Sequence, residues 1–260
     1  MRARALAALF VAVFLIATAG RAAAQVLRDL PALDLRYDLF YGDPAKKVGS
    51  ASVSFKAIDT PRGRRLEVKS KIEYTLQREQ PKAQAPFAYA EEATLLCDQT
   101  GVVRFDTSAR ALGDERVNSA IRIGENYQLT TTFQGKKHTK TITAGVQRTN
   151  FGLFAGGYLE KPLDGGDMFE DFPLLYPVGG DHKPRQKFRE GIFPFTVGTK
   201  QVPAIVTRLD RPNKTTDRIW NAATGPQILI RMEEASNMGK ITYELVSVNG
   251  VAPDRSALLQ

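Results

Sequence analysis

The 260-residue sequence contains one cysteine, two histidines and one tryptophan. A single cysteine, Cys97, excludes an intrachain disulfide. Two histidines, His138 and His182, are too few for the common zinc sites, and neither His-Glu-x-x-His nor Cys-x-x-Cys occurs. The Gly-x-Ser-x-Gly turn of serine hydrolases is also absent. We therefore expect no metal site and no cofactor, and an enzymatic function is the least favoured class.

Long hydrophobic runs are missing as well, except at the N-terminus. The apolar run Ala5–Ala19 follows two arginines and precedes the small residues Ala22–Ala24, the pattern of a secretory signal peptide. We predict a signal peptide over residues 1–24, cleaved before Gln25, and a periplasmic mature protein without a transmembrane segment. An uncleaved membrane anchor is the alternative, but about 15 apolar residues are short for crossing a bilayer.

The charge is modest and scattered. The full chain carries a formal net charge of +8, and removal of residues 1–24, with their three arginines and no acid, leaves +5. A mildly basic exported protein favours anionic surfaces such as lipid headgroups. A scattered charge in this compartment gives no nucleic-acid signature.

Most of the mature chain alternates between apolar and polar residues. In Leu66–Leu76, Leu66, Val68, Ile72 and Tyr74 share one face and charged residues occupy the other, as in an antiparallel strand with one buried side. Similar runs recur between turn signals up to Val248. The pattern predicts a mainly β fold: one antiparallel domain over residues 25–250, whose single curved sheet closes into an open or half barrel. Residues 251–260 show no pattern and are expected to form a flexible tail.

Two segments interrupt the alternation. Asn150–Tyr158 has aromatic residues at helical spacing and predicts a short helix. Lys161–Gly198 contains eleven glycines and prolines in 38 positions, which predicts an irregular loop insertion. Long loops of this kind are typically lids or binding loops. We expect a lid over the barrel mouth or, equally, a plug at the end of the barrel or an interaction surface.

This loop supplies the candidate ligand-binding residues, because cations next to large apolar side chains suit a lipid with an anionic headgroup. The candidates, in chain order, are Phe169, Phe172, Tyr176, Lys183, Arg185, Lys187, Arg189, Phe193 and Phe195. No catalytic residue is predicted. Cys97 continues the apolar face of Ala93 and Leu95, so a buried, inert thiol is favoured over a nucleophile.

Short motifs at both ends resemble a known family. Residues 37–42 (Tyr-Asp-Leu-Phe-Tyr-Gly) followed by 48–51 (Val-Gly-Ser-Ala), and later Trp220 with residues 239–245 (Gly-Lys-Ile-Thr-Tyr-Glu-Leu), resemble a family of uncharacterised exported bacterial domains. In that family an Asp is usual where this chain has Asn221. Such domains are similar to the open β-barrels of the periplasmic lipoprotein carriers, the LolA and LolB type, which implies an acyl-chain site between a curved sheet and a lid.

Two functions follow from these observations. The first is a periplasmic binding or carrier module for a lipid or other apolar ligand, held in a trough formed by the inner faces of 66–76, 127–133 and 228–232. The second is a non-catalytic accessory or assembly subunit of a cell-envelope complex, with the loop aromatics as its contact surface. The trough could also be filled by its own side chains.

Overall fold

The structure is a computed structural model that describes residues 31–77, 86–98, 101–143, 153–154, 169–211, 215–236 and 239–259. Within these ranges, the side chains of residues 143, 169–174, 181–185 and 236 are not described. The predicted signal peptide, residues 161–168 and most of the helix predicted over 150–158 lie outside this part of the chain. In the part that is described, no helix is long and apolar enough to cross a membrane.

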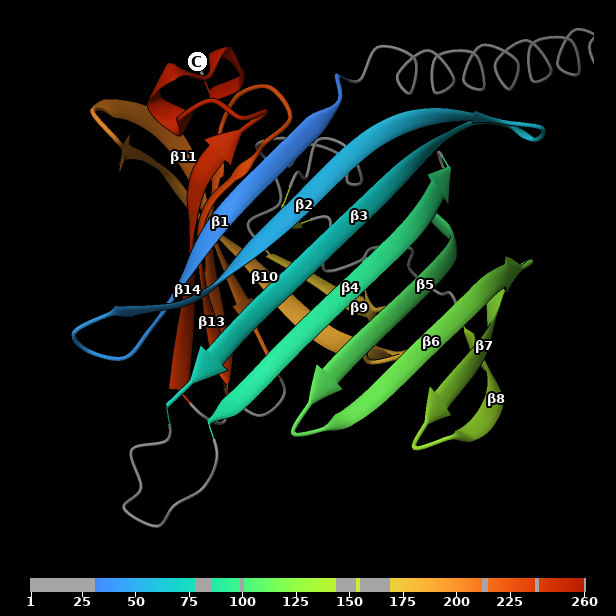
Figure 1. Ribbon diagram of the computed structural model, residues 1–260. Coiled ribbons are helices and arrows are strands. Elements are labelled where there is room, and N and C mark those ends of the chain that lie inside the picture. The colour runs from blue at the N-terminus through green and yellow to red at the C-terminus, as the bar shows by residue number, and fades with distance from the viewer. Residues whose placement is uncertain are drawn as a thin grey trace, which may run out of the picture.

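The described chain forms fourteen antiparallel strands of one sheet (Figure 1). Successive strands are joined mostly by tight turns, many with glycine at positive φ, the backbone conformation that glycine adopts without a steric penalty. The strands are β1 (Leu33–Tyr41), β2 (Lys46–Thr60), β3 (Gly63–Leu76), β4 (Phe87–Asp98), β5 (Gly101–Ala111), β6 (Asp114–Ile123), β7 (Asn126–Phe133), β8 (Lys136–Thr143), β9 (Phe169–Tyr176), β10 (Asp181–Val197), β11 (Lys200–Asp210), β12 (Thr216–Ala222), β13 (Leu229–Ser236) and β14 (Gly239–Val248).

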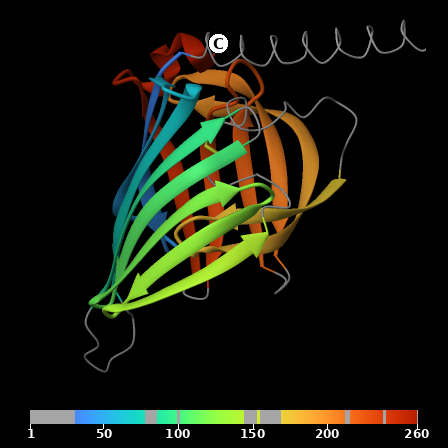
Figure 2. The same cartoon turned by 90° about the vertical axis from the view of Figure 1, so that its right-hand side faces the viewer.

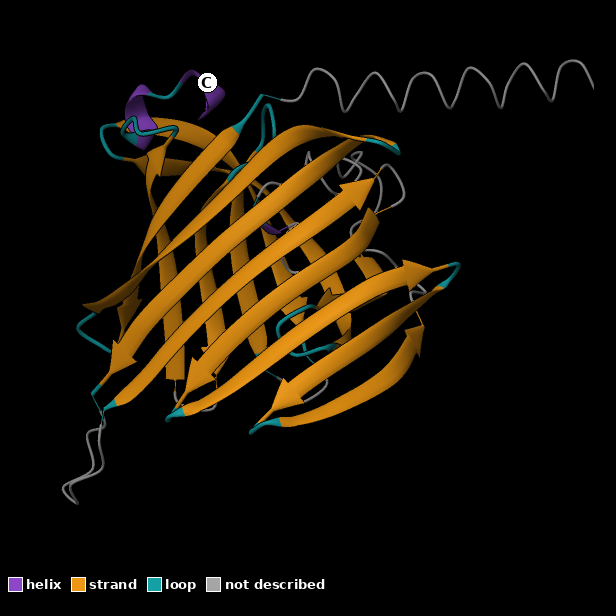
Figure 3. Cartoon of the chain, turned by 45° about the vertical axis from the view of Figure 1, so that its right-hand side comes forward, coloured by secondary structure: helices purple, strands orange, loops and turns teal. Residues whose placement is uncertain are grey.

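The strand order explains the shape of the sheet. It runs from β8 to β1, continues with β14, and ends at β9, so that the first and last strands pair in the middle. The sheet curls until β3–β8 face β9–β13 across an interior (Figures 2 and 3). Because β8 and β9 stand at opposite ends of the order and do not pair, the barrel is curved but not closed. The predicted fold class, an antiparallel half barrel, is confirmed.

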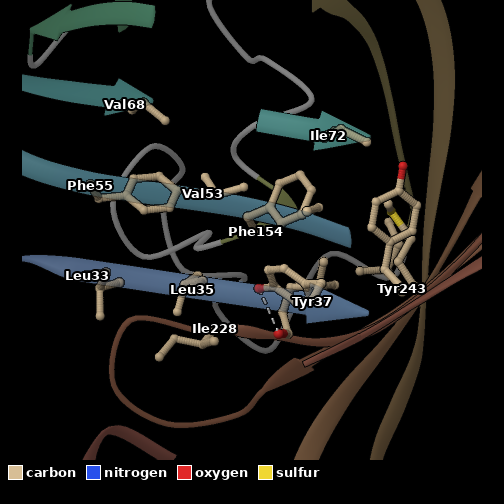
Figure 4. Close-up of a cluster of buried hydrophobic side chains, with 14 of the residues drawn as sticks. Leu33, Leu35, Tyr37, Val53, Phe55, Val68, Ile72, Phe154, Ile228 and Tyr243 are labelled. Carbon is tan, nitrogen blue, oxygen red and sulfur yellow. Dashed lines mark hydrogen bonds between the residues drawn. The ribbon is translucent and has the colours of Figure 1, made fainter. Parts of the chain in front are cut away.

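The alternation read from the sequence places the core on the concave side. Leu35, Val53, Val68 and Phe105 on β1, β2, β3 and β5 are fully buried, as expected for the inward residues of a one-sided sheet. One part of the interior is packed with side chains in this way (Figure 4). Cys97 is also buried, at 1% exposure, so the predicted core thiol is confirmed.

The segment Leu153–Phe154 lies inside the sheet and fills part of it. The Phe154 ring packs edge-on against Tyr37 at 5.4 Å and against Tyr243 at 6.3 Å between centroids (Figure 4). Leu229 donates its backbone N–H to the Phe154 carbonyl at 2.9 Å. This segment therefore joins the β1 side of the interior to the β13–β14 side.

Asn221 holds the same segment from β12. Its Nδ2 donates to the carbonyl oxygens of Leu153 and Gln227, both at 2.9 Å. A carboxylate could not donate either bond. The amide at this position, where the family pattern has an Asp, thus has a direct structural use.

The prediction of an irregular loop over 161–198 was wrong for its described part. Residues 169–176 and 181–197 form strands β9 and β10. Pro184 lies where β10 pairs only with β9, and Pro194 lies where it pairs only with β11, so each missing N–H falls on an edge-like stretch. Residues 186–188, which pair with both neighbours, separate the two stretches, and a bulge follows between Arg189 and Gly191. Counting glycine and proline misses this arrangement.

The turn between β9 and β10 enters the interior. Nδ2 of Asn118, a buried residue of β6, donates to the carbonyls of Pro177 and Val178 at 3.1 and 2.6 Å. Gly180 adopts φ +63°, and a Cβ there would lie 3.0 Å from the Leu129 side chain. The hairpin is therefore fixed to the inner face of the opposite wall, nearer to a plug than to a lid.

The C-terminal prediction also needs correction. Residues 251–260 were expected to be a flexible tail, but they contain two 3-10 turns, η2 (Pro253–Arg255) and η3 (Ala257–Leu259). Leu259 is buried, and Asp254 accepts hydrogen bonds from the hydroxyl and backbone N–H of Thr199. These contacts anchor the tail at one end of the sheet (Figure 1). A segment this short packs by side-chain contacts that leave no periodic signature.

Candidate functional site

The interior that the core leaves free is a pocket of about 610 Å³. We call it the inner pocket. It lies between the two walls of the curved sheet, and its size is within the range of small-molecule sites. The described residues that line it are Ile72, Tyr74, Tyr89, Glu91, Ala109, Ala111, Leu112, Asp114, Arg116, Phe133, Leu153, Phe154, Tyr176, Val178, Gly179, Arg211, Asp217, Met232, Glu234 and Tyr243.

The three segments predicted to form a trough do contribute to this lining. Ile72 and Tyr74 come from β3, Phe133 from β7 and Met232 from β13. The interior is thus partly filled and partly hollow, which answers the alternative that the sequence left open. The pocket is not apolar, however, because carboxylates and arginines line it beside the aromatic rings.

Glu91 is a buried acid of the pocket. Cross-strand pairing sets it between Ile72 on β3 and Ala109 on β5, and it is 8% exposed. Its carboxylate accepts a hydrogen bond of 2.5 Å from the Tyr89 hydroxyl. Burial raises the pKa of Glu91 to about 7; the Tyr89 hydrogen bond opposes this rise and the charge of Glu234 adds to it.

Glu234 approaches from the opposite wall, on β13. It accepts hydrogen bonds from Arg211 at 3.1 Å and from the Tyr243 hydroxyl at 3.4 Å. Its side chain keeps 36% of its surface accessible, because it faces the inner pocket. Burial raises its pKa, the charge of Asp217 adds to the rise, and Arg211 opposes it.

Arg211 and Asp217 form the best-compensated pair of the site. The guanidinium donates hydrogen bonds to both carboxylate oxygens: Nη2 to Oδ1 at 2.7 Å and to Oδ2 at 2.8 Å, and Nε to Oδ2 at 3.0 Å. Asp217 also accepts the backbone N–H of Ala235 at 3.0 Å. Bidentate pairing of this kind satisfies both groups. Arg211 is therefore committed mainly to Asp217, and Glu234 receives only a share of its charge.

Three tyrosines stand beside the two glutamates. Tyr74 and Tyr89, paired across β3 and β4, have stacked rings 5.0 Å apart, and Tyr243 from β14 bonds Glu234. The pKa of Tyr74 rises to about 12, first through burial and then through the charges of Glu234 and Glu91. The charges of both carboxylates therefore act on the pKa of Tyr74, although Glu91 and Glu234 belong to opposite walls.

The arrangement is suited to binding a ligand. Among the residues that the structure describes, no three His, Cys, Asp or Glu side chains are grouped to hold a metal ion. The pocket offers aromatic faces, tyrosine hydroxyls and carboxylates, and such a lining fits a ligand with an apolar body and a polar group.

The predicted ligand-binding residues differ in where they lie relative to the inner pocket. Tyr176 lines the inner pocket. Lys187 is buried at 8% exposure, and its register through Leu209 to Asp217 places it on the inner face of β10. Phe193 is 49% exposed and lies away from the pocket.

The remaining candidates are further from the pocket or undescribed. Phe195 packs against Trp220, with ring centroids 6.2 Å apart. Arg189 pairs with Thr207 next to the β10 bulge. The side chains of Phe169, Phe172, Lys183 and Arg185 lie outside the described residues. Of the five candidates whose side chains are described, Tyr176 is in the lining of the pocket.

Sequence reasoning missed the acidic part of the site. Glu91 had a readable signal, because it continues the inward face of Cys97, Leu95 and Ala93 and is an acid on an apolar face. Arg211 and Asp217 gave no such signal. Their pairing depends on the β11–β12 turn, which brings together two residues six positions apart.

The comparisons with known proteins concern the fold. No family model and no curated protein matches the chain. The crystal structure of a beta-barrel-like protein of domain of unknown function DUF1849 from Brucella abortus is similar to this chain. The two share a TM-score of 0.60 and 10% sequence identity, over 85% of this chain and 98% of that chain.

This likeness supports a beta-barrel-like domain of unknown function, as the motifs at both ends of the sequence indicated. At 10% identity it shows the fold alone. It does not support the narrower resemblance to the LolA and LolB carriers, which stays a prediction.

Proposed function

We propose that this protein is an exported periplasmic binding module that holds a small ligand with an apolar body in the inner pocket. The observation that carries this proposal is the pocket itself: about 610 Å³ inside a curved sheet, lined from both walls by aromatic and apolar side chains. A carrier role for a lipid or similar molecule, as the sequence suggested, is compatible with that volume.

Burial of an apolar chain would supply the affinity. Each methylene removed from water contributes about 0.8 kcal/mol. A chain of about eight methylenes then gives roughly 6 kcal/mol before ordering costs, which suits reversible binding. The periplasmic location rests on the predicted signal peptide over residues 1–24. Mass analysis of the protein from its own host should find Gln25 at the mature N-terminus.

A neutral apolar dye tests the binding role. N-phenyl-1-naphthylamine should bind the purified protein saturably with an increase in fluorescence. Ala109→Trp, which fills the pocket from β5, should abolish that binding. Ala88→Trp on the exposed face of β4 is the matched control and should not change it. Equal dye binding by all three folded proteins, or no saturable binding at all, would contradict the proposal.

The alternative, an accessory or assembly subunit, is favoured by a different surface. Val117, Ile121 and Ile123 point outward from β6 and are 41%, 50% and 61% exposed. Such a row of exposed apolar side chains is typical of protein contacts. Crosslinking in the envelope through a photoreactive residue at position 121 should capture one defined partner if this reading holds, and none if the row is only solvated.

A further inference from the structure

The inner pocket is acidic although the chain is basic. Its described lining residues include four carboxylates and two arginines, a formal charge of −2, whereas the whole chain carries +8. One arginine, Arg211, is engaged by Asp217. The other, Arg116, lies over the Phe133 ring at 5.3 Å. Of the other carboxylates, Asp114 is exposed and accepts a hydrogen bond from Gln134 at 3.0 Å. Glu91 and Glu234 are the less exposed acids.

Glu91 lacks a cationic partner within the described part of the chain. Its one hydrogen bond there comes from the neutral Tyr89 hydroxyl, and no described lysine or arginine lies within 4.0 Å of it. Buried charges in proteins are paired or they become neutral by taking up a proton. A positive group in the pocket would supply the missing partner.

The aromatic residues near Glu91 favour an organic cation over a small metal ion. The stacked rings of Tyr74 and Tyr89 stand beside it, and Tyr243 from β14 reaches Glu234 on the other wall. Aromatic faces with nearby carboxylates are the typical surroundings of bound quaternary ammonium groups. An inorganic ion would leave those apolar faces without a partner.

We propose that the inner pocket takes an amphiphile with a positively charged amine or ammonium group, which lies between Glu91 and Glu234 while the apolar chain occupies the rest of the pocket. This inference rests on the proposed binding function and adds the class of ligand. It differs from the anionic headgroup expected from the sequence, because the described lining is acidic and does not include Lys187 or Arg189, the two cations of that expectation whose side chains are described.

Three probes with the same tail separate the inference from the function on which it rests. Octyltrimethylammonium, octyl glucoside and octyl sulfate share the octyl chain and differ in the headgroup and its charge. Each is titrated below its micelle concentration by displacement of N-phenyl-1-naphthylamine. The ammonium probe should bind about tenfold more tightly than the glucoside. The sulfate should bind most weakly.

Variants assign the preference to the two acids. Glu91→Gln and Glu234→Gln should each weaken ammonium binding by about tenfold and leave glucoside binding within about twofold. Glu92→Gln is the matched control: it is adjacent to Glu91, but its side chain is on the outer face and 67% exposed. It should change neither affinity.

The pH dependence gives a second readout, since a quaternary ammonium does not titrate. Its affinity should rise as Glu91 loses its proton near pH 7, and Glu91→Gln should flatten that rise. The titratable and charged groups that face Glu91 or share its pocket are Tyr74, Tyr89, Asp114, Arg116, Tyr176, Arg211, Asp217, Glu234 and Tyr243, and Lys187 lies on the inner face of β10.

The outcomes are distinct. Equal affinity for all three probes, insensitive to both glutamine variants, overturns the inference and leaves the binding function in place. Tightest binding of octyl sulfate also overturns it and returns the choice to the cations of β10. If neither the dye nor any probe binds, both the inference and the proposed function fall.

Discussion

Replacing Glu91 by glutamine should stabilise the protein at alkaline pH and have much less effect at acid pH. The pKa of this carboxyl rises from its ordinary value of 4.5 to about 7 on folding, mainly through burial. Below pH 4.5 the group is protonated in both the folded and the unfolded chain, so it does not lower the free energy of unfolding. Between 4.5 and 7 the unfolded chain ionises first, so the free energy of unfolding falls as pH rises.

The magnitude follows from the two pKa values. A rise from 4.5 to about 7 corresponds to about 3 kcal/mol at 1.36 kcal/mol for each pH unit, all of it present above pH 7. Of this, roughly 2.5 kcal/mol develops between about pH 5 and pH 8. The glutamine side chain of the variant keeps the size of Glu91 and an oxygen to accept the Tyr89 hydroxyl, but it does not titrate.

Urea denaturation at about pH 5 and about pH 8 measures how the free energy of unfolding of each protein changes with pH. The wild-type protein and the Glu91→Gln and Glu92→Gln variants are unfolded in parallel, and their midpoints and slopes are compared. Glu91→Gln should gain roughly 2 to 3 kcal/mol over wild type on going from pH 5 to pH 8, and Glu92→Gln should gain nothing. If the stability profiles of wild type and Glu91→Gln run parallel, Glu91 is already ionised in the folded protein and burial does not raise its pKa.

The remaining predictions concern packing. Gly49→Ala should destabilise the protein by about 1 to 3 kcal/mol in thermal unfolding, because a Cβ there would lie 2.6 Å from the Cα of Tyr74; an unchanged melting temperature would show that β3 moves aside. Phe154→Ala should cost about 3 to 5 kcal/mol in urea, since its ring packs against Tyr37; a loss below about 1 kcal/mol would mean that the segment contributes little to the core. Cys97, whose pKa burial raises to about 12, should react with a thiol reagent only after denaturation, and rapid labelling of the folded protein would contradict the register of β4.

The sequence was most informative where the alternation within a single strand shows which of its faces is buried. In Leu66–Leu76 the two faces differ in every other residue, so both the strand and its buried side could be predicted. Cys97 followed from the same reasoning on β4. These predictions need no knowledge of neighbouring strands, since alternation depends only on which side of the sheet meets water.

Segments whose structure depends on pairing were predicted less well. Lys161–Gly198 is rich in glycine and proline, which usually excludes regular structure. Strand β10 nevertheless forms, because Pro184 and Pro194 fall where it has a single paired neighbour and Gly191 follows a bulge. Which side of a strand is unpaired is a property of the whole sheet, and one strand's sequence does not contain it.

The inner pocket contains residues that could be predicted from a single strand and residues that could not. Tyr74 and Met232 could be placed on inward faces from alternation alone, and they line the pocket. The meeting of Glu91 with Glu234 across the interior could not, because β4 and β13 are neighbours in neither sequence nor sheet. Only the curl of fourteen strands brings the two walls together, and no local pattern encodes that curl.

The cost of Glu91 bears on what the pocket is for. An apolar side chain at this position would continue the face of Ala93 and Leu95 without the roughly 3 kcal/mol that its ionised carboxylate costs. A sheet that only needed a filled interior would gain nothing from an acid there. The segment at Phe154 shows that this chain can fill its interior with aromatic side chains. A carboxylate facing a hollow, with stacked tyrosines beside it, is instead what a bound cation would stabilise.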